Sequence, residues 1–439
     1  MKSLITGACA AALLAAAPAL AQPHDHSQHQ APQPTAPADP HAGHTPPAAA
    51  DPHAGHGAPA AMDTRWASGT SWQPSVTPHH GVHLKLGGWD VMTHAVLNGV
   101  YDWQEGPRGD EKAFVSGMVM GMATRRFDAG ELQLNAMLSP DPFMGKRGYP
   151  LLLAAGESAD AIDVLVDRQH PHDLFMELSA RYTHDLTPSD KVFVYAGLPG
   201  EPAFGPPTFM HRLSIMDSPE APISHHWLDS THIVFGVVTA GYIHDDWKVE
   251  VSRFKGREPD EDRFDIENPK LDSTAVRLSW NPTPNWSLQA SWADAKSVEA
   301  LDPDQDVTKW SASAIHTVPF GDDGWWSTTA AWGRRSAAHG EQLDAWVLES
   351  AVKPNAAWTI FARAERAENN ELDAGHGHHG ETYTVAKASI GAVRDWQVAK
   401  NVKFGVGGLV AKNWVPGGLE ASYGGDPTGA MAFVRVKIE

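Results

Sequence analysis

The side chains best suited to chemistry in this sequence are histidines and methionines that recur in groups. One group lies in a low-complexity stretch near the N-terminus and consists of His24, His26, His29, His41, His44, His53 and His56. Imidazole is a ligand for copper, zinc and nickel, and histidine-rich tracts commonly bind metal. The unit ADPHAGH occurs at 38–44 and again at 50–56, which favours a repeated two-histidine ligand unit. The alternative is a spacer whose histidines have no ligand role.

A second group is predicted from three consecutive strand-like stretches at 84–103, 113–124 and 129–139. Each alternates between two faces, and the faces that carry Val91, Val115 and Leu134 are apolar. The opposite faces carry Asp90, Met92, His94, Met118, Met120, Met122 and Met137. Thioether sulfur selects Cu(I), so one inward patch of these side chains predicts a copper site. The alternative is that methionine fills space against an inserted loop.

Two long polar stretches carry a third group. The motif RQHPHD supplies His170 and His172, and the stretch 199–231 supplies His211, His225 and His226. Long loops of a barrel commonly fold inward, which would place these imidazoles in the interior as metal ligands. A network of hydrogen bonds between histidines and loop carboxylates is the alternative.

Strands of about ten residues must position these groups. We mark sixteen of them between residues 84 and 438, with short connections such as HDD and NPTPN alternating with long ones such as 139–172 and 199–231. An even strand number, short turns at one end and long loops at the other are typical of outer-membrane barrels. The sequence therefore predicts an all-β fold, an antiparallel barrel of about 16 strands with a disordered His-rich N-terminal tail.

Period-two alternation supports a wall between lipid and lumen. In 247–252 the apolar residues Trp247, Val249 and Val251 alternate with Lys248, Glu250 and Ser252. Tryptophans also follow several short turns, at Trp247, Trp286, Trp326 and Trp358. Indole rings at one height form an aromatic belt at a membrane interface. A soluble β-sandwich would not place tryptophan so regularly beside the short turns.

The chain divides into three parts. Residues 1–21 have a charged start, an apolar run and an A-x-A site, as in a secretory signal peptide. Residues 22–80 are rich in Ala, Pro and His and form the tail, because they cannot bury enough apolar surface to fold alone. Residues 81–439 form the barrel. The single cysteine, Cys9, lies in the signal peptide, which leaves the mature chain without a thiolate metal ligand.

Composition excludes some functions. The formal net charge of −19 attracts cations and repels nucleic acid. The one faint enzyme signal is His316 near Ser311 and Ser313, and no Gly-x-Ser-x-Gly motif accompanies it. The sequence thus predicts no enzyme.

The stretch from Phe209 to Tyr242, with FKGREPDEDRFDIE after it, resembles an uncharacterised family of exported bacterial barrel proteins associated with copper and heavy-metal resistance. The plan of a His-rich tail before a barrel is also similar to that of the copper resistance protein B family. This tail lacks the Met-rich repeats of that second family. The resemblance implies metal handling but no catalytic residue.

The expected function is binding or passage of transition-metal ions, copper first and zinc or another divalent cation next, in metal resistance or homeostasis. The alternative is a general cation-preferring porin-like channel without specific metal binding. Either function would place the barrel in the outer membrane of a Gram-negative bacterium, in contact with lipid, with the tail in the periplasm. Periplasmic metal-handling proteins are the partners that the first function implies.

Overall fold

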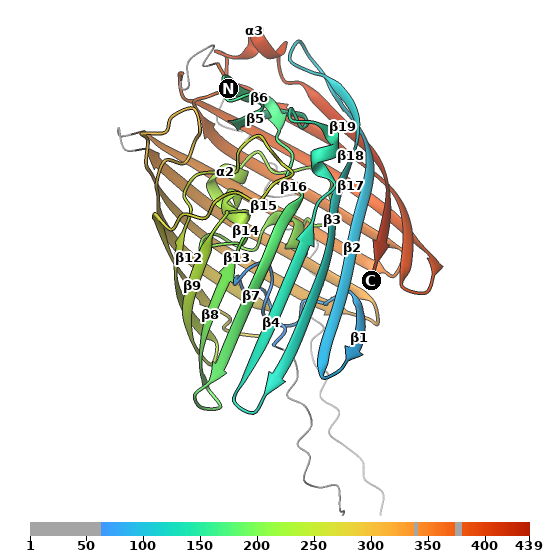
Figure 1. Cartoon of the computed structure of the whole chain (residues 1–439). Helices are drawn as coiled ribbons and strands as arrows, with labels where there is room; N and C mark the ends of the chain where they lie inside the picture. The colour runs from blue at the N-terminus through green and yellow to red at the C-terminus, as the bar shows by residue number, and fades with distance from the viewer. Residues whose placement is uncertain (1–62, 338–340, 374–379) are drawn as a thin grey trace, which may run out of the picture. The chain divides into compact units, whose positions relative to one another are not determined.

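Residues 63–439 form one compact unit in the computed structural model, which describes residues 63–337, 341–373 and 380–439. Its main element is an antiparallel sheet that closes into a barrel (Figure 1). The strands are β1 (Val82–Leu86), β2 (Trp89–Gln104), β3 (Glu111–Phe127), β4 (Gly130–Leu138), β5 (Tyr149–Ser158), β6 (Val164–Gln169), β7 (Phe175–Asp185), β8 (Asp190–Gly197), β9 (Val237–His244), β10 (Trp247–Phe254), β11 (Ser273–Trp280), β12 (Trp286–Ala295), β13 (Val307–Phe320), β14 (Gly324–Ala337), β15 (Gln342–Asn355), β16 (Trp358–Asn369), β17 (Tyr383–Ala399), β18 (Val402–Trp414) and β19 (Thr428–Ile438).

The barrel closes where the last strand pairs with β2. Gly429 to Ile438 of β19 lie opposite Gln104 to Ala95 of β2, and the sixteen wall strands from β2 to β19, without β5 and β6, follow one another in chain order. The predicted closed barrel of sixteen strands is therefore confirmed. The predicted first strand, 84–103, is instead two strands, because Gly87 and Gly88 have positive φ and turn the chain between β1 and β2.

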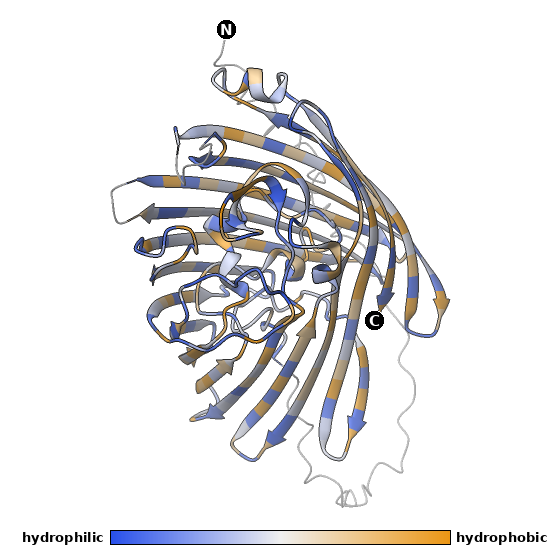
Figure 2. Ribbon diagram, turned by 45° about the horizontal axis from the view of Figure 1, so that its top comes forward, coloured by the Kyte–Doolittle hydropathy of each residue, from blue (hydrophilic) through white to orange (hydrophobic). Residues whose placement is uncertain are grey.

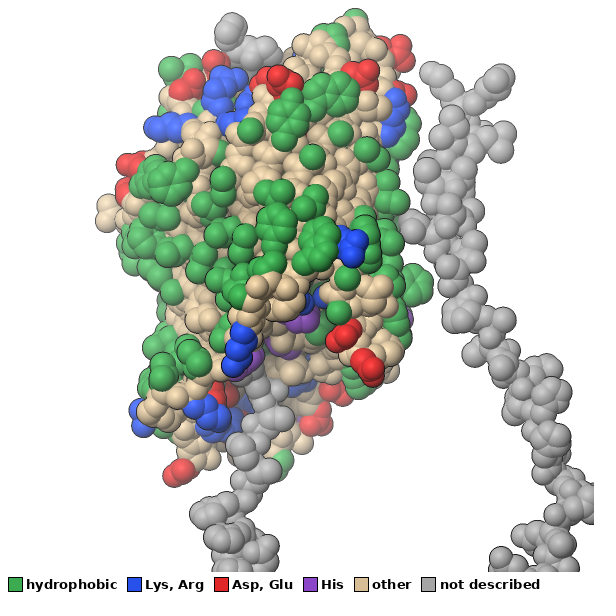
Figure 3. Space-filling model, turned by 90° about the vertical axis from the view of Figure 1, so that its right-hand side faces the viewer, with side chains coloured by type: hydrophobic (Ala, Val, Ile, Leu, Met, Phe, Trp, Pro, Cys, Tyr) green, Lys and Arg blue, Asp and Glu red, His purple; other side chains and the backbone are tan. Residues whose placement is uncertain are grey.

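The outer wall exposes the apolar half of each strand. Val249 and Val251 are exposed, whereas Lys248, Glu250 and Ser252 of the same strand are buried toward the lumen, as predicted. Figure 2 shows the resulting hydropathy bands along the strands, and Figure 3 shows apolar side chains covering the middle of the wall. This alternation follows from the two-residue period of a strand.

Exposed tryptophans form a belt near each end of the barrel wall. Trp247, Trp286, Trp326 and Trp358 are exposed beside the short turns. A second set lies toward the long loops and consists of Trp103, Trp310 and Trp346. Two belts separated by an apolar band are typical of a wall that spans a bilayer.

Two long connections fold into the lumen (Figure 2). The first insert, 139–174, contains the 3₁₀ turn η1 (Asp141–Met144) and the small sheet of β5 and β6. The second insert, 198–236, contains η2 (Phe209–His211), α2 (His225–Leu228) and η3 (Ser230–His232), and α3 (Glu420–Tyr423) lies in the last long loop. In the part of the chain that the structure describes, no helix is long and apolar enough to cross a membrane.

Residues 63–80 form a cap segment at the short-turn end, although the sequence assigns them to the tail. Arg65 Nη1 donates to the Asp245 carbonyl at 2.6 Å, and Asn281 Nδ2 donates to the Gln73 carbonyl at 2.8 Å. Both barrel residues lie at short turns. Trp72 is buried, so this part of the predicted tail is ordered because its indole enters the apolar interior of the barrel.

Candidate functional site

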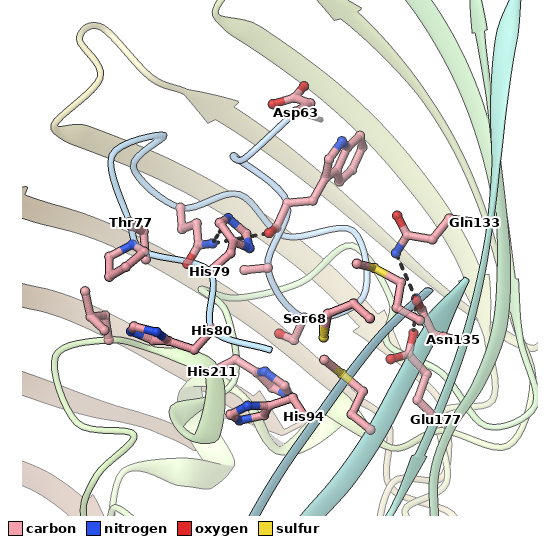
Figure 4. A pocket seen from close by; sticks show the side chains of 18 of the residues that line it. Asp63, Ser68, Thr77, His79, His80, His94, Gln133, Asn135, Glu177 and His211 are labelled. Atoms are coloured by element: carbon pink, nitrogen blue, oxygen red, sulfur yellow. Dashed lines mark hydrogen bonds between the residues drawn. The ribbon is translucent and has the colours of Figure 1, made fainter. Parts of the chain in front are cut away.

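A chamber of about 130 Å³ lies at the short-turn end, between the cap segment and the inner wall of β2, β3 and β4 (Figure 4). Its sulfur and imidazole lining comes from the wall, the cap segment and the second insert. These residues are Met92, His94, Met120, Met122, His79, His80, His211 and Met216. Four of them, Met92, His94, Met120 and Met122, belong to the inward patch that the sequence predicts, and we call this cavity the Met/His chamber.

The register of β2 and β3 brings the chamber methionines together. Met92 lies directly opposite Met122, and His94 lies directly opposite Met120. Facing residues of an antiparallel pair point to the same side, so all four side chains enter the lumen. Asp90 shares this face, since it lies opposite Thr124 of β3, but its side chain is exposed and forms an ion pair with Lys85 of β1.

Two chamber imidazoles carry buried ring nitrogens without a hydrogen-bond partner in the described residues. They are Nδ1 of His94 and Nε2 of His211, and Figure 4 shows the two rings beside each other. Burial, with His94 nearby, lowers the pKa of His211 to about 4, which leaves that imidazole neutral. Neutral imidazoles and thioethers together are suitable ligands for copper.

Carboxylates line the same chamber. Asp63, Glu131 and Glu177 contribute to its wall. Glu177 Oε1 accepts a hydrogen bond from Ser179 Oγ at 2.6 Å and from Tyr195 Oη at 3.1 Å. The chamber therefore combines soft ligands with carboxylates, although Arg181 also lines it and Asp63 forms an ion pair with Arg65 at 2.8 Å.

Met118 and Met137 face inward as predicted but do not line the chamber. Both are buried in a cluster with Met176, Ile233 and Phe235. The second insert supplies Ile233 and Phe235, so these two sulfurs pack under a loop and fulfil the alternative of space filling.

The histidines of the two inserts come together in the middle of the lumen. The ring centres of His170 and His226 are 5.6 Å apart, and those of His170 and His225 are 6.2 Å apart. His172 and His232 lie 5.1 Å apart, and His232 and His225 lie 5.2 Å apart. We call these five residues the histidine cluster; His211 lies in the Met/His chamber instead.

Carboxylates surround the histidine cluster. His170 Nε2 lies 3.0 Å from Glu157 Oε1, and His226 Nδ1 lies 3.4 Å from Glu258 Oε1. Burial lowers the pKa of His225 to about 4, although its bond to Asp229 opposes this shift. Burial likewise holds the pKa of His232 well below its usual value, so both rings are neutral.

The sequence interpretation did not include His232 among the ligands. A signal was present, since STH follows HHWLD directly and places His232 within one turn of α2. Within the described ranges, no group of three or more His, Cys, Asp or Glu side chains stands ready to hold a metal ion. The tail histidines, His24 to His56, lie outside the described residues, so their predicted role stays a prediction.

The faint enzyme signal at β13 does not form a site. Ser311 and Ser313 are buried toward the lumen, whereas the ring of His316 stacks outside on Trp286 with 4.3 Å between ring centres. A hydroxyl and an imidazole on opposite faces of one strand cannot exchange a proton.

Comparison with known proteins identifies the fold. No protein-family model and no curated protein matches the chain. Among solved structures, OmpF of Salmonella typhi in complex with daunomycin shares 9% identity, with a TM-score of 0.50 over 81% of this chain and 100% of that chain. OprB of Pseudomonas putida shares 10% identity, with a TM-score of 0.50 over 80% and 94%. The chain therefore has the fold of an outer-membrane β-barrel.

Proposed function

We propose that this chain is a porin-like channel of the outer membrane that passes only small solutes and prefers cations. The observation that carries this proposal is the filling of the lumen by two inserts that are bound to the wall. A barrel of this fold and strand number leaves an aqueous path when its loops stay at the rim. Here the inserts replace most of that path with protein.

Buried ion pairs fix the second insert to the wall. Arg212 Nη2 lies 2.7 Å from Glu349 Oε1 of β15, and Glu220 Oε1 lies 2.6 Å from Lys387 Nζ of β17. Breaking a buried pair leaves an uncompensated charge and costs about 3–5 kcal/mol. The insert is therefore held against the wall and narrows the lumen.

The cap segment narrows the short-turn end in the same way. The Arg181 guanidinium of β7 lies 3.7 Å from the centre of the Trp66 ring, and Arg277 Nη2 donates to Thr70 Oγ1 at 3.0 Å. Solutes that cross the lumen must pass this segment and the carboxylates of the Met/His chamber. Carboxylates along this path favour the passage of cations.

A second candidate function, transition-metal binding or passage in resistance or homeostasis, is supported by the Met/His chamber. Its lining of Met92, Met120 and Met122 offers three thioethers, which suit Cu(I). In this function the tail histidines would collect copper or zinc in the periplasm and exchange it with periplasmic metal-handling proteins. No catalytic step is part of either proposal.

Conductance measured in planar lipid bilayers tests the channel function. The full mature chain is expected to give small, cation-selective single-channel currents. Replacing Trp66 and Arg181 together with alanine should detach the cap segment and raise the conductance severalfold. The matched control is Trp286→Ala on the outer wall, which should leave the conductance unchanged. A barrel that conducts neither before nor after detachment would contradict the channel and leave metal binding as the function.

A further inference from the structure

Three residues of the histidine cluster share an arrangement that hydrogen bonding alone does not explain. His172 Nδ1 lies 2.8 Å from Asp141 Oδ2, and His225 Nδ1 lies 2.8 Å from Asp229 Oδ1. His232 Nδ1 lies 2.7 Å from the Asp229 carbonyl oxygen. Because each oxygen is an acceptor, each Nδ1 carries the proton and donates it.

In the neutral form of each ring, the other nitrogen is then an unprotonated lone pair. Nε2 of His172, of His225 and of His232 is buried and has no hydrogen-bond partner in the described residues. An unsatisfied buried acceptor costs about 1–3 kcal/mol, so three in one cluster favour a partner that satisfies them together. In contrast, neither His170 nor His226 has a buried ring nitrogen without a partner in the described residues.

A transition-metal ion is the partner that fits this pattern. Histidines that ligate a metal nearly always donate their second ring N–H to a carboxylate or a backbone carbonyl, which fixes the tautomer. Asp141 and Asp229 provide this fixation here. Water could satisfy one lone pair, but three imidazoles anchored through Nδ1 in one cluster favour an ion.

The spacing of the rings agrees with this assignment. Two imidazoles that share a tetrahedral ion at the usual zinc–nitrogen distance have ring centres about 5 Å apart. His232 is 5.1 Å from His172 and 5.2 Å from His225. The centre of the Phe209 ring lies 6.2 Å from the ring centre of His172 and 5.6 Å from that of His225.

We propose that His172, His225 and His232 form a lumenal binding site for one borderline divalent cation, Zn²⁺ or Cu²⁺, with Asp141 and the backbone and side chain of Asp229 as its outer shell. Because no three ligands stand ready in the described conformation, binding has to draw His172 and His225 together around His232. The site is independent of the Met/His chamber and goes beyond ion conduction, since neither needs these three residues.

Titration of the full-length chain with Zn²⁺ and with Cu²⁺ in detergent micelles tests the site. The seven tail histidines, at 24, 26, 29, 41, 44, 53 and 56, are first replaced by glutamine, which removes the competing ligands of the tail without shortening the chain. Isothermal calorimetry should give one ion per chain. His225→Gln and His232→Gln should each weaken the affinity at least tenfold.

The matched control is His226→Gln, a buried neighbour of His225 in α2 whose ring already contacts Glu258. It should change the affinity less than twofold. An equal loss in this control and in the two ligand variants would overturn the site. So would the absence of binding by the chain without tail histidines, which would assign water to the three lone pairs.

X-ray absorption at the zinc edge keeps the proposal testable if a variant does not fold. With the site histidines unchanged, the spectrum of the zinc-loaded chain should show three imidazole nitrogens at about 2.0–2.1 Å. A shell of oxygen or sulfur ligands would overturn the site. Bilayer conductance of His232→Gln is measured separately and should stay unchanged, so failure of the metal site and failure of the channel are distinguishable.

Discussion

The Met/His chamber and the histidine cluster are built from similar residue types but differ in what surrounds them. In the chamber, sulfur atoms from β2 and β3 face a cavity, and neither free imidazole nitrogen has a partner among the described residues. In the histidine cluster, the rings are packed together, and carboxylates fix most of them. The chamber offers an open cavity lined by thioethers. In the cluster, hydrogen bonds orient the imidazole rings, and the ligands are nitrogen atoms.

The difference shows that a residue's place, on a wall strand or on an insert, decides which ion its region suits. Wall strands place methionines by the two-residue period, without any need for charge. The inserts are held by ion pairs, so their histidines lie near carboxylates that also set the ring tautomers. We therefore expect the chamber to prefer Cu(I) and the cluster to prefer Zn²⁺ or Cu²⁺.

Removing the carboxylate that supports the cluster should have the largest effect. Asp229 accepts hydrogen bonds from the Phe209 amide at 2.9 Å and from His225, and it forms an ion pair with Arg212. Asp229→Ala should lower the free energy of unfolding by about 3–5 kcal/mol, because Arg212 keeps a buried charge with one carboxylate fewer. Denaturant unfolding in detergent measures this change. Asp260→Ala, in an exposed loop, is the control, and equal midpoints for the two variants would show that Asp229 does not stabilise the insert.

Exchanging the chamber methionines should have a smaller, selective effect. Met92, Met120 and Met122 all replaced by leucine should weaken Cu(I) binding at least tenfold, which corresponds to about 1.4 kcal/mol. Zinc binding and stability should change little, because the side-chain volumes are nearly conserved. Competition with a Cu(I) chelator measures the affinity.

The control for the chamber exchange uses the two methionines that pack outside the chamber. Met118 and Met137, both replaced by leucine, should leave Cu(I) binding unchanged. If this pair lowers the affinity as much as the chamber triple does, the distinction between lining and packing methionines is wrong.

The smallest expected effect concerns Glu201 of the second insert, whose side chain is hydrogen-bonded to Ser68 of the cap segment. Burial raises the pKa of Glu201 from its usual 4.5 to about 8, although the nearby Arg277 opposes this shift. Since the folded chain holds this proton more tightly than the unfolded chain does, the stability contribution is complete below about 4.5. It falls as the pH rises and is lost above about 8. Melting temperatures at pH 5 and pH 8.5 should therefore differ more for the unchanged chain than for Glu201→Gln. An identical difference would remove Glu201 as the cause.

Much of the wall could be predicted from local patterns. Alternation in 247–252, short turns such as HDD, and the tryptophans beside them sufficed for the strand number and the lipid-facing side. The same rule placed Met92, His94, Met120 and Met122 on the inner wall, because side-chain direction in a strand depends only on parity. It failed between β1 and β2, where the turn glycines lie inside an otherwise strand-like stretch.

The interior could not be predicted in this way. Nothing local distinguishes Met118, which packs under Phe235, from Met120, which faces the chamber. The entry of residues 63–80 into the lumen depends on Arg181 and Arg277, both more than a hundred residues away in the sequence.

The sequence by itself determined the closed barrel, its polarity across the wall and the supply of imidazole and thioether side chains. Only the tertiary structure decided that His172 of one insert meets His225 and His232 of the other, and that Asp141 and Asp229 leave three ring nitrogens unsatisfied. The reason is physical. Strand parity is a local property of the backbone, whereas two inserts meet only after the sheet has closed around them and long-range ion pairs have fixed their positions.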